Sequence, residues 1–316
     1  MEIGILEPTD FSQGALEIIR CVGNVEFFQG GDRKKFLKDK AVLFIRLGHY
    51  VDDEFINEAP KLQVLVSPTT GVTHLDLAAA EKQEIDVLTL RDENEFLRTV
   101  TASSEHCLGM VLGVLRNYPH AIICPGNVHW NRDSVRGHDV RGLNIGVIGF
   151  GRIGQWLCRV LQVMGAKVRW YDSHAIGSKV SPDAIRCEGI TQLIEASTLV
   201  VLSASYIPGS PPLLNSELID SLKDKYLVNI GRGELLDEPH LLRRLCEGWF
   251  AGVALDVLSN EPKTHQELVE LAGLVKKYNF MLTPHIGGAT FESSHLTEEF
   301  MAHKLIQHLS LSGIAS

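Results

Sequence analysis

The sequence lacks the cysteine patterns of metal-binding and disulfide-rich proteins. Its six cysteines are spread over 316 residues, with no C-x-x-C pair and no spacing typical of zinc ligands. They are Cys21, Cys107, Cys124, Cys158, Cys187 and Cys246. We therefore predict free thiols, a reducing compartment and no bound metal.

An excess of positive charge and a long apolar run are also lacking. The formal net charge of −9 argues against nucleic acid or an anionic membrane surface as the main partner. No apolar run approaches the ~20 residues that span a bilayer, and the first residues, MEIGILEP, do not resemble a secretion signal. We predict a cytoplasmic protein, and we interpret its one basic run, residues 33–40, as a solvated helix face.

Three common catalytic motifs do not occur in the chain. It has no H-E-x-x-H, no G-x-S-x-G and no G-x-x-x-x-G-K-[ST] sequence. These motifs supply, in order, a zinc site, a nucleophilic serine and a phosphate-binding loop. The sequence therefore offers no support for a zinc protease, a serine hydrolase or a P-loop enzyme.

The chain does contain a regular alternation of short apolar runs and helical patterns, which predicts an α/β protein with parallel sheets. Its length and its 45% hydrophobic content suffice for two domains. Strands are expected at residues 3–6, 25–28, 42–45, 62–66, 85–88, 145–148, 167–171, 199–202, 226–230, 250–255 and 280–282. Helices are expected at 101–116, 239–246 and 292–311, with a loop at 117–141.

The segment 144–172 has the pattern of a dinucleotide-binding unit. An apolar strand leads into Gly149, Gly151 and Gly154, which have G-x-G-x-x-G spacing, and a helix with one apolar face follows. In such a unit the first glycine makes the turn, the second admits pyrophosphate and the third lets the helix pack against the strand. Because strand, turn and helix occur in order, we prefer cofactor binding to a ligand-free glycine turn.

Asp172 ends the next predicted strand, 18 residues after Gly154. A carboxylate there can accept hydrogen bonds from the adenosine ribose and would repel a 2′-phosphate. Ser173 and His174 follow, where an arginine could have received that phosphate. We therefore predict NAD(H) as the cofactor in preference to NADP(H).

Three chemically useful residues follow three of the later strands, namely Arg232, Glu261 and His285. Because the carboxyl ends of parallel strands share one edge of a sheet, we expect the three side chains to converge. Arginine can hold a carboxylate, histidine can transfer a proton near neutral pH, and a carboxylate can orient that histidine. Each also has an ordinary interpretation: a turn arginine, a loop histidine, and a glutamate that ends a turn.

This equipment fits the reduction of a 2-keto acid. Hydride addition to the keto carbon leaves negative charge on the carbonyl oxygen, which then needs a proton. His285 would supply that proton, or remove it in the reverse direction, while Glu261 stabilises the imidazolium. Arg232 would bind the substrate carboxylate and polarise the carbonyl group.

Several segments resemble the D-isomer-specific 2-hydroxyacid dehydrogenases, including the phosphoglycerate dehydrogenases. They are GFGRIG (149–154), NIGRGELLDEPHLLRRL (229–245), GVALDVLSNEP (252–262), TPHIGGAT (283–290), SPTTGVTHLDL (67–77) and SSEHCLGM (103–110). The resemblance implies two doubly wound parallel-sheet domains with a cleft between them. Residues 1–99 and 290–316 would form a flavodoxin-like substrate-binding lid, and 100–289 a Rossmann NAD-binding domain.

The resemblance also assigns residues by motif position, with Arg232, Glu261 and His285 as the catalytic set. Residues matching cofactor contacts are Thr70, Gly149, Gly151, Arg152, Ile153, Gly154, Asp172, Ser203, Ile230, Gly231, Arg232, Asp256, His285 and Gly288. The family often has His-x-Pro where this chain has Ser203-Ala204-Ser205. The substrate carboxylate would meet backbone amides around Gly71 and Val72, and Arg46 could either contact substrate or be an ordinary arginine at a strand end.

The sequence leaves the substrate and the assembly open. Phosphoglycerate, glycerate and lactate-like acids all remain open, because the pocket residues come from loops whose contacts the sequence does not define. The family implies a homodimer, with residues 126–141 as a candidate interface arm. A second hypothesis is an NAD(H)-sensing scaffold like the C-terminal-binding co-repressors, although no peptide-docking motif is evident.

Overall fold

The protein is described by a computed structural model that covers residues 1–123, 130–174, 184–261 and 263–312. The chain divides into two compact units. Unit 1 consists of Met1–Val100 and Ala289–Ser316, and unit 2 consists of Thr101–Gly288. The chain therefore passes between the units twice, after Val100 and after Gly288.

Unit 1 contains a five-stranded parallel sheet in the order β2-β1-β3-β4-β5. Its elements are β1 (Glu2–Ile5), α1 (Gln13–Arg20), β2 (Asn24–Phe27), α2 (Arg33–Leu37), β3 (Val42–Phe44), α3 (Asp53–Glu58), β4 (Val64–Val66), α4 (Leu77–Lys82), β5 (Asp86–Leu88), α5 (Asn94–Leu97) and α13 (Phe291–Ser312). This strand order is that of flavodoxin-like folds, so the predicted doubly wound architecture is confirmed.

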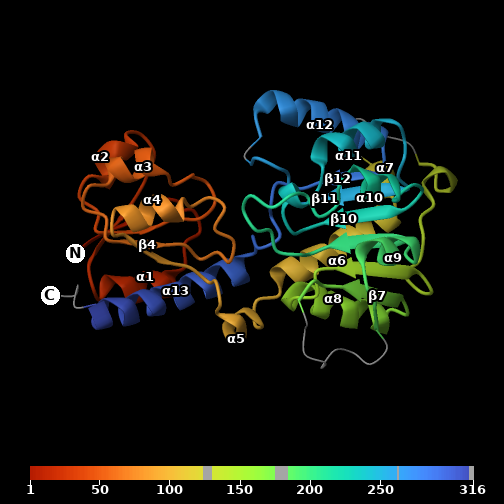
Figure 1. Cartoon of the computed structure of the whole chain (residues 1–316). Helices are drawn as coiled ribbons and strands as arrows, with labels where there is room; N and C mark the ends of the chain where they lie inside the picture. The colour runs from red at the N-terminus through yellow and green to blue at the C-terminus, as the bar shows by residue number, and fades with distance from the viewer. Residues whose placement is uncertain (124–129, 175–183, 262, 313–316) are drawn as a thin grey trace. The chain divides into compact units, whose positions relative to one another are not determined.

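Helices cover both faces of the unit 1 sheet. Figure 1 shows α1 and α13 side by side on one face and α2, α3 and α4 on the other. Alternate residues of each strand point to opposite faces, so Val42 and Phe44 pack towards α13 while Leu43 packs towards α3 and α4. All five strands come from the first 90 residues, and the C-terminal helix covers one face of the sheet that they form.

The basic run at residues 33–40 is only partly the solvated helix face that we predicted. Helix α2 does carry Arg33 and Lys34 near the surface, but the Lys40 side chain is just 1% exposed. Its ammonium group pairs with Asp39 at 2.5 Å and Glu26 at 2.6 Å. Nothing in the local sequence marked Lys40 as buried, because Glu26 comes from the neighbouring β2 segment.

Unit 2 contains a seven-stranded parallel sheet in the order β12-β11-β10-β9-β6-β7-β8. Its elements are α6 (Ala102–Leu115), α7 (Tyr118–Ala121), β6 (Asn144–Ile148), α8 (Arg152–Val163), β7 (Lys167–Tyr171), β8 (Ile185–Arg186), α9 (Ile190–Glu195), β9 (Leu199–Leu202), α10 (Ser216–Asp220), β10 (Tyr226–Asn229), α11 (Glu238–Cys246), β11 (Gly252–Leu255), α12 (His265–Lys277) and β12 (Phe280–Leu282), with short 3-10 helices at Asp133–Val135 and Gly233–Leu235. The order reverses at β6, as in Rossmann folds, which confirms the predicted architecture.

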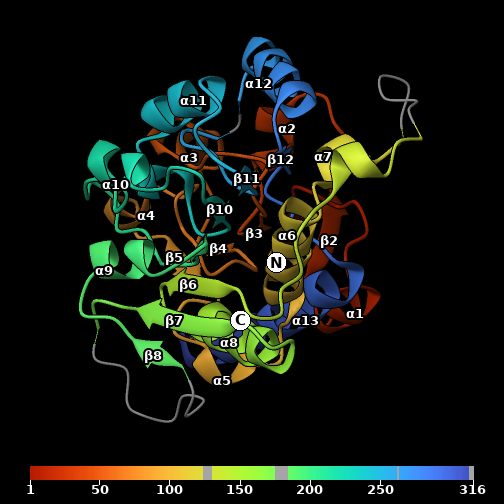
Figure 2. The ribbon, with the colours of Figure 1, turned by 90° about the vertical axis from the view of Figure 1, so that its right-hand side faces the viewer.

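Two apolar layers fix this sheet. One joins α6 and α8 to strand residues such as Val147 and Val201, and the other joins α9 to α12 to residues such as Val200 and Leu227. Figure 2 shows α6 and α8 on one face and α9, α10 and α11 on the other. The carboxyl ends of β6, β9, β10 and β11 consequently share one edge, where the predicted site residues follow.

The predicted loop at 117–141 holds more structure than expected. Helix α7 and the 3-10 helix Asp133–Val135 lie in it, and the Trp130 side chain is 93% exposed. The proposed interface arm, residues 126–141, lies partly outside the described residues, as does Cys124. Dimerisation through this segment stays a prediction. Among the described residues, no helix has both the length and the apolar character needed to cross a membrane.

Candidate active site

The glycine-rich turn after β6 has the sterics of a dinucleotide cradle. Gly149 has a φ of +90°, and a Cβ there would lie 2.4 Å from the backbone nitrogen of Ala204. A Cβ on Gly154 would lie 2.2 Å from the Gly149 carbonyl oxygen, so α8 could not pack as closely. A Cβ on Gly151 would meet no atom within 4 Å. Gly151 is also the N-cap of α8, so this turn and helix end fit a pyrophosphate.

Asp172 and Ser203 hold the shape of that turn. The Asp172 carboxylate accepts hydrogen bonds from the backbone N–H groups of Phe150 at 2.7 Å and His174 at 2.9 Å. The Ser203 hydroxyl donates to the Gly149 carbonyl oxygen at 2.9 Å. Asp172 therefore lies beside the cradle, where a ribose would come, and Ser203 ties the end of β9 to the turn.

Arg232 follows β10 in a turn built by a buried asparagine. The Asn229 side chain accepts a hydrogen bond from the N–H of Gly231 at 3.0 Å and donates to the carbonyl of Arg232 at 2.9 Å. The Arg232 guanidinium donates to the Gly231 carbonyl at 2.8 Å. Burial lowers the pKa of Arg232, and the charges of Glu261 and nearby acids oppose that shift. A partly desolvated guanidinium is well suited to bind a carboxylate.

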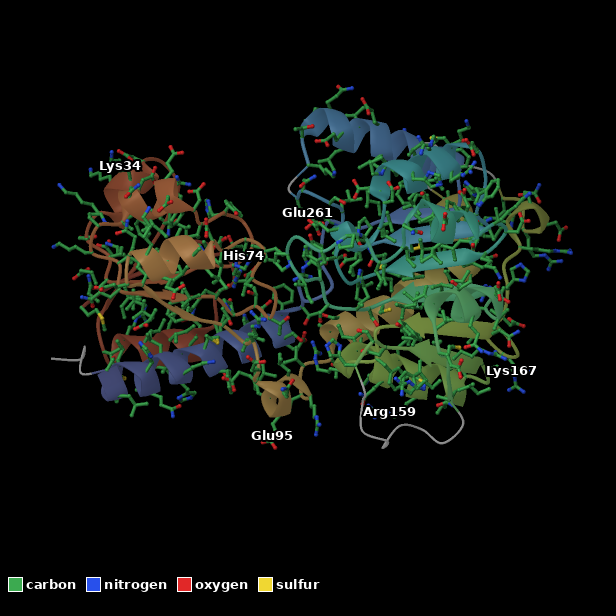
Figure 3. The ribbon with its side chains drawn as sticks, in the orientation of Figure 1. Lys34, His74, Glu95, Arg159, Lys167 and Glu261 are labelled. Carbon is green, nitrogen blue, oxygen red and sulfur yellow. The ribbon has the colours of Figure 1, made fainter. Side chains whose placement is uncertain are left out.

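The loop after β11 carries Glu261 and packs against the Arg232 turn. One Glu261 oxygen accepts a hydrogen bond from the N–H of Leu258 at 2.7 Å, and Glu238 fixes the N–H of Ser259 at 2.5 Å. A Cβ on Gly233 would lie 1.9 Å from the Leu258 carbonyl carbon, so only glycine allows this approach. Figure 3 labels Glu261 in this loop, between β11 and α12.

His285 pairs with Glu261 as the sequence predicted. The imidazole Nδ1 lies 2.6 Å from Glu261 Oε2, and both side chains are part-exposed, at 24% and 31%. Within the described residues, Nε2 of His285 makes no hydrogen bond. His285 has a φ of +54°, a left-handed conformation that is costly for a residue with a Cβ and that recurs at functional sites. The ring is thus oriented through one nitrogen and open at the other.

Asp256, at the end of β11, is the most heavily bonded group of the site. It accepts hydrogen bonds from Thr283 Oγ1 at 2.6 Å, from the N–H groups of Ile286 and Gly287 at 2.9 Å, and from His106 Nε2 at 3.1 Å. Burial alone would raise the pKa of Asp256, but these hydrogen bonds outweigh it and lower the pKa. The aspartate is therefore held as a carboxylate.

The remaining predicted cofactor residues of unit 2 line the same edge of the sheet. Ile153 packs into the core from the first turn of α8, and burial lowers the pKa of its neighbour Arg152. Ile230 is 8% exposed at the end of β10, and Gly288 is exposed after the His285 loop. The sheet thus brings the predicted residues of unit 2 to consecutive strand ends.

Four predicted residues belong to unit 1. Thr70, Gly71 and Val72 lie in the loop after β4, near His74, which Figure 3 labels. Within the described residues, neither the Gly71 nor the Val72 N–H donates a hydrogen bond. Arg46 follows β3 and is engaged elsewhere.

The guanidinium of Arg46 ion-pairs with the buried Glu298 and donates to the Thr9 carbonyl oxygen at 2.9 Å. Burial raises the pKa of Glu298, and the charge of Arg46 opposes that shift. Of the two interpretations of Arg46, the contacts favour the ordinary arginine at a strand end.

Sequence reasoning missed three residues of this region, Asn229, His106 and Thr283. All three lie inside segments whose family resemblance was noted, but their side chains act on partners that only the fold reveals. His106 and Asp256 are 150 residues apart in sequence. Within the described residues, no group of three or more His, Cys, Asp or Glu side chains is arranged to hold a metal ion.

Two family models match the chain. Residues 4–95 match the catalytic domain of the D-isomer specific 2-hydroxyacid dehydrogenases, and residues 108–287 match the NAD-binding domain of the same family. The second match covers more than half of the chain and contains Gly149, Asp172, Arg232, Glu261 and His285. The catalytic-domain model matches a stretch of unit 1, and the NAD-binding model a stretch of unit 2.

Individual relatives agree. The chain is 30% identical over 304 residues to D-3-phosphoglycerate dehydrogenase of Escherichia coli, covering 94% of this chain and 72% of the relative. It is 28% identical over 285 residues to glyoxylate reductase of Pyrococcus furiosus, covering 87% and 82%. The structure of D-lactate dehydrogenase from Aquifex aeolicus with NAD and lactic acid has the same fold, with a TM-score of 0.81, 21% identity and coverage of 99% and 96%. The chain belongs to the D-isomer-specific 2-hydroxyacid dehydrogenases, an NAD-dependent enzyme family, and it carries that family's NAD-binding domain.

Proposed function

We propose that the protein interconverts a D-2-hydroxy acid and its 2-keto acid, with His285 as the acid/base, Glu261 as its partner and Arg232 as the carboxylate-binding residue. The observation that carries this proposal is the His285–Glu261 pair at 2.6 Å, in which Nε2 makes no hydrogen bond within the described residues. A ring fixed at one nitrogen and open at the other can transfer a proton to a substrate.

Each residue has a defined task in the reduction. NADH, when bound, supplies the hydride. Glu261, bonded to Nδ1, stabilises the imidazolium form of His285, whose Nε2 donates the proton that the carbonyl oxygen needs and leaves the ring neutral. Arg232 binds the substrate carboxylate with a partly desolvated guanidinium, which also favours negative charge on the adjacent carbonyl oxygen. In the oxidation direction Nε2 accepts the hydroxyl proton.

We further propose that the N–H groups of Gly71 and Val72 bind a carboxylate. Both belong to the loop after β4, where the Thr69 hydroxyl donates to the Gly71 carbonyl at 2.8 Å and Ser67 contacts His74 at 3.1 Å. These contacts fix the loop while leaving the two N–H groups without an acceptor in the described chain. Adjacent backbone N–H groups of this kind form a concave site for an anion.

The cofactor preference is part of the proposal. The Asp172 carboxylate beside the glycine turn would repel the 2′-phosphate of NADP. Asp172→Asn keeps a side-chain oxygen for the Phe150 N–H bond but removes the charge. We expect it to tighten NADPH binding by roughly tenfold, as for the loss of one close repulsion of about 1.4 kcal/mol, while NADH binding changes less.

The test is NADH oxidation with a panel of 2-keto acids. Glyoxylate and phosphohydroxypyruvate come first, because the relatives are named for glyoxylate and phosphoglycerate, followed by hydroxypyruvate, pyruvate and phenylpyruvate. Turnover of at least one acid that is lost in His285→Ala, with NADH binding retained, supports the proposal. Full turnover in His285→Ala would contradict it. Neither the described residues nor the relatives support the alternative of a scaffold.

A further inference from the structure

His106 has no assigned task, yet its side chain reaches the centre of the site. It lies in the second turn of α6 and is about one-fifth exposed, with Nε2 at 3.1 Å from Asp256 Oδ1 and 3.3 Å from Thr283 Oγ1. Thr283 itself donates to Asp256 at 2.6 Å. The three side chains therefore form a closed polar triangle around a carboxylate that is only 2% exposed.

Asp256 in turn fixes three consecutive residues of the loop that carries His285. Its backbone carbonyl accepts the His285 N–H at 2.8 Å, and its carboxylate accepts the N–H groups of Ile286 and Gly287 at 2.9 Å each. His285 has a φ of +54°. Such a conformation persists only when surrounding contacts hold it, and Asp256 supplies three of them.

The protons of the triangle can be placed. The hydrogen bonds to Asp256 lower its pKa in spite of its burial, so the carboxylate only accepts. The Thr283 hydroxyl donates its proton to Asp256, so towards His106 its oxygen can only accept a hydrogen bond. Since both partners of His106 Nε2 are acceptors, this nitrogen carries the proton and donates.

The triangle also lies where the chain passes between its two units. His106 comes five residues after Thr101, the first residue of unit 2, and Thr283 to Gly287 come directly before Gly288, its last residue. The two segments that connect the units are thus tied to each other, through Asp256, inside unit 2.

We propose that His106 is a positioning residue for His285: by donating to Asp256, it orients the carboxylate that holds residues 285–287 and so keeps His285 facing Glu261. The proposal rests on the proposed function for its kinetic consequence. Its structural consequence is whether the His285–Glu261 hydrogen bond forms, and this can be measured without any enzymatic activity.

Three variants separate the hydrogen bond from the bulk of the ring. In His106→Gln the amide nitrogen falls close to the position of Nε2, so it can still donate. In His106→Asn the side chain stays polar but is too short, and His106→Leu has neither donor nor polarity. The matched control is His308→Leu, which removes another histidine–aspartate pair, with Asp86 at 3.0 Å in unit 1.

Two readouts are needed, the imidazole N–H resonances by NMR and steady-state kinetics with the best keto acid. An Nδ1–H of His285 that is hydrogen-bonded to Glu261 should give a downfield signal. We expect this signal in the wild type, His106→Gln and His308→Leu, and its loss in His106→Asn and His106→Leu. In the last two, kcat should fall roughly 10- to 100-fold, as for an acid displaced by about 1 Å.

Opposite outcomes overturn the proposal. It is wrong if His106→Asn and His106→Leu keep both the signal and kcat within twofold of the wild type. It is also wrong if His106→Gln behaves like His106→Leu, since the packing of the ring would then matter and its hydrogen bond would not. A wild type without turnover on any acid would defeat the proposed function, while the NMR comparison would still decide the positioning role.

Discussion

The pairs His285–Glu261 and His240–Asp220 have nearly the same geometry, with nitrogen–oxygen distances of 2.6 Å and 2.7 Å, yet only the first has a ring nitrogen that makes no hydrogen bond within the described residues. Both lie in unit 2. They differ in what else their atoms bind. A short histidine–carboxylate contact therefore does not identify an acid/base pair.

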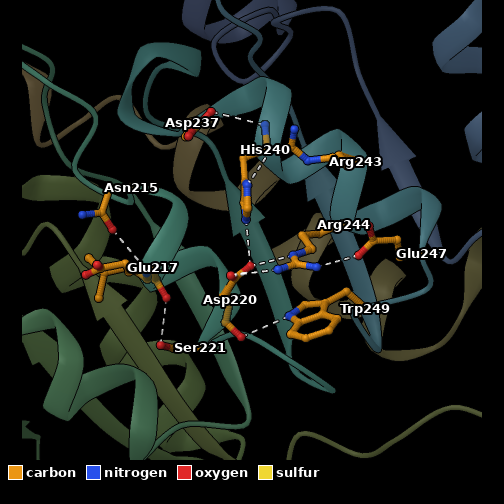
Figure 4. Close-up of polar contacts among 11 residues, drawn as sticks. Asn215, Glu217, Asp220, Ser221, Asp237, His240, Arg243, Arg244, Glu247 and Trp249 are labelled. Atoms are coloured by element: carbon orange, nitrogen blue, oxygen red, sulfur yellow. Dashed lines mark hydrogen bonds and ion pairs between the residues drawn. The ribbon is translucent and has the colours of Figure 1, made fainter.

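Both ring nitrogens of His240 form hydrogen bonds with protein groups. Figure 4 shows Asp220 between His240 and Arg244, whose Nε and Nη2 atoms lie 2.6 Å and 2.9 Å from its oxygens. The other ring nitrogen of His240 accepts from Arg243 at 2.7 Å. Arginine cannot accept a hydrogen bond, so Nδ1 of His240 is the acceptor in this contact. Neither nitrogen is left for a substrate.

The His285 pair is half engaged. Glu261 binds one ring nitrogen and the N–H of Leu258, and the second ring nitrogen makes no hydrogen bond within the described residues. His285 also has left-handed backbone geometry, whereas His240 lies in helix α11. His285 thus combines a strained backbone with a ring nitrogen that is open to a substrate. His240 has neither feature, and its contacts hold helices together.

The largest expected effect separates the two histidines. His285→Ala should lower kcat by roughly 10²- to 10⁴-fold, the usual contribution of a general acid, without changing the NADH dissociation constant by more than about twofold. His240→Ala should leave kcat within about twofold, because its nitrogens bind only protein. Steady-state kinetics with fluorescence titration of NADH measure both. Equal losses of kcat in the two variants would mean that the open ring nitrogen does not distinguish the two histidines.

Substitution of the two carboxylates, Glu261 and Asp220, should affect kcat in the same order as substitution of the histidines, but by a smaller factor. Glu261→Gln keeps an oxygen for Leu258 but removes the charge that stabilises the imidazolium, so kcat should fall by roughly tenfold or more. Asp220→Asn should leave kcat unchanged. An active Glu261→Gln enzyme would mean that the pair is structural, like its counterpart.

For thermal stability we expect the opposite order, with a larger loss from substitution of His240 than of His285. His240→Leu removes one hydrogen bond between α10 and α11 and one within α11. Each is worth about 1 kcal/mol, so the melting temperature should fall by about 2–4 °C per bond lost. His285→Ala should change it less, since it removes a single side-chain hydrogen bond, and that bond joins two part-exposed groups. Differential scanning calorimetry of both variants tests this, and a larger loss in His285→Ala would contradict it.

The smallest effect is a pH dependence of stability at Asp220. Hydrogen bonds from Arg244, and then His240, hold the pKa of Asp220 well below its ordinary range. A carboxyl with a lowered folded-state pKa stabilises the protein above the unfolded pKa of about 3.9, and this contribution is lost as the pH falls towards the folded value. The wild type should therefore lose more stability than Asp220→Asn between pH 5 and pH 3. Parallel slopes in urea unfolding would contradict the assignment.

The sequence predicted the elements that have strong local patterns. Strands at 167–171, 199–202 and 280–282 were predicted with the bounds that the structure has. The strand at 199–202 is a continuous apolar run that is buried throughout, as expected for the middle of a parallel sheet, whereas the strand at 167–171 alternates polar and apolar residues. Strand β8 was missed because it has two residues, both exposed, at the edge of the sheet. Such a strand carries no apolar pattern.

The site was predictable in its types of residue but not in its contacts. Arg232, Glu261 and His285 each follow a strand, and the parallel sheet brings Glu261 and His285 into contact. The Arg46–Glu298 and His106–Asp256 contacts join residues 252 and 150 positions apart. No local pattern encodes such pairs, since each depends on how distant elements pack.

The most direct test of the central claim is isotope transfer. The protein is incubated with its best 2-keto acid and NADH that carries deuterium at both C4 positions, and the product is analysed by mass spectrometry and chiral chromatography. We predict one deuterium at C2 of a D-2-hydroxy acid from the wild type and from His240→Ala, and almost none from His285→Ala. An unlabelled or L-configured product, or equal labelling by His285→Ala, would contradict it.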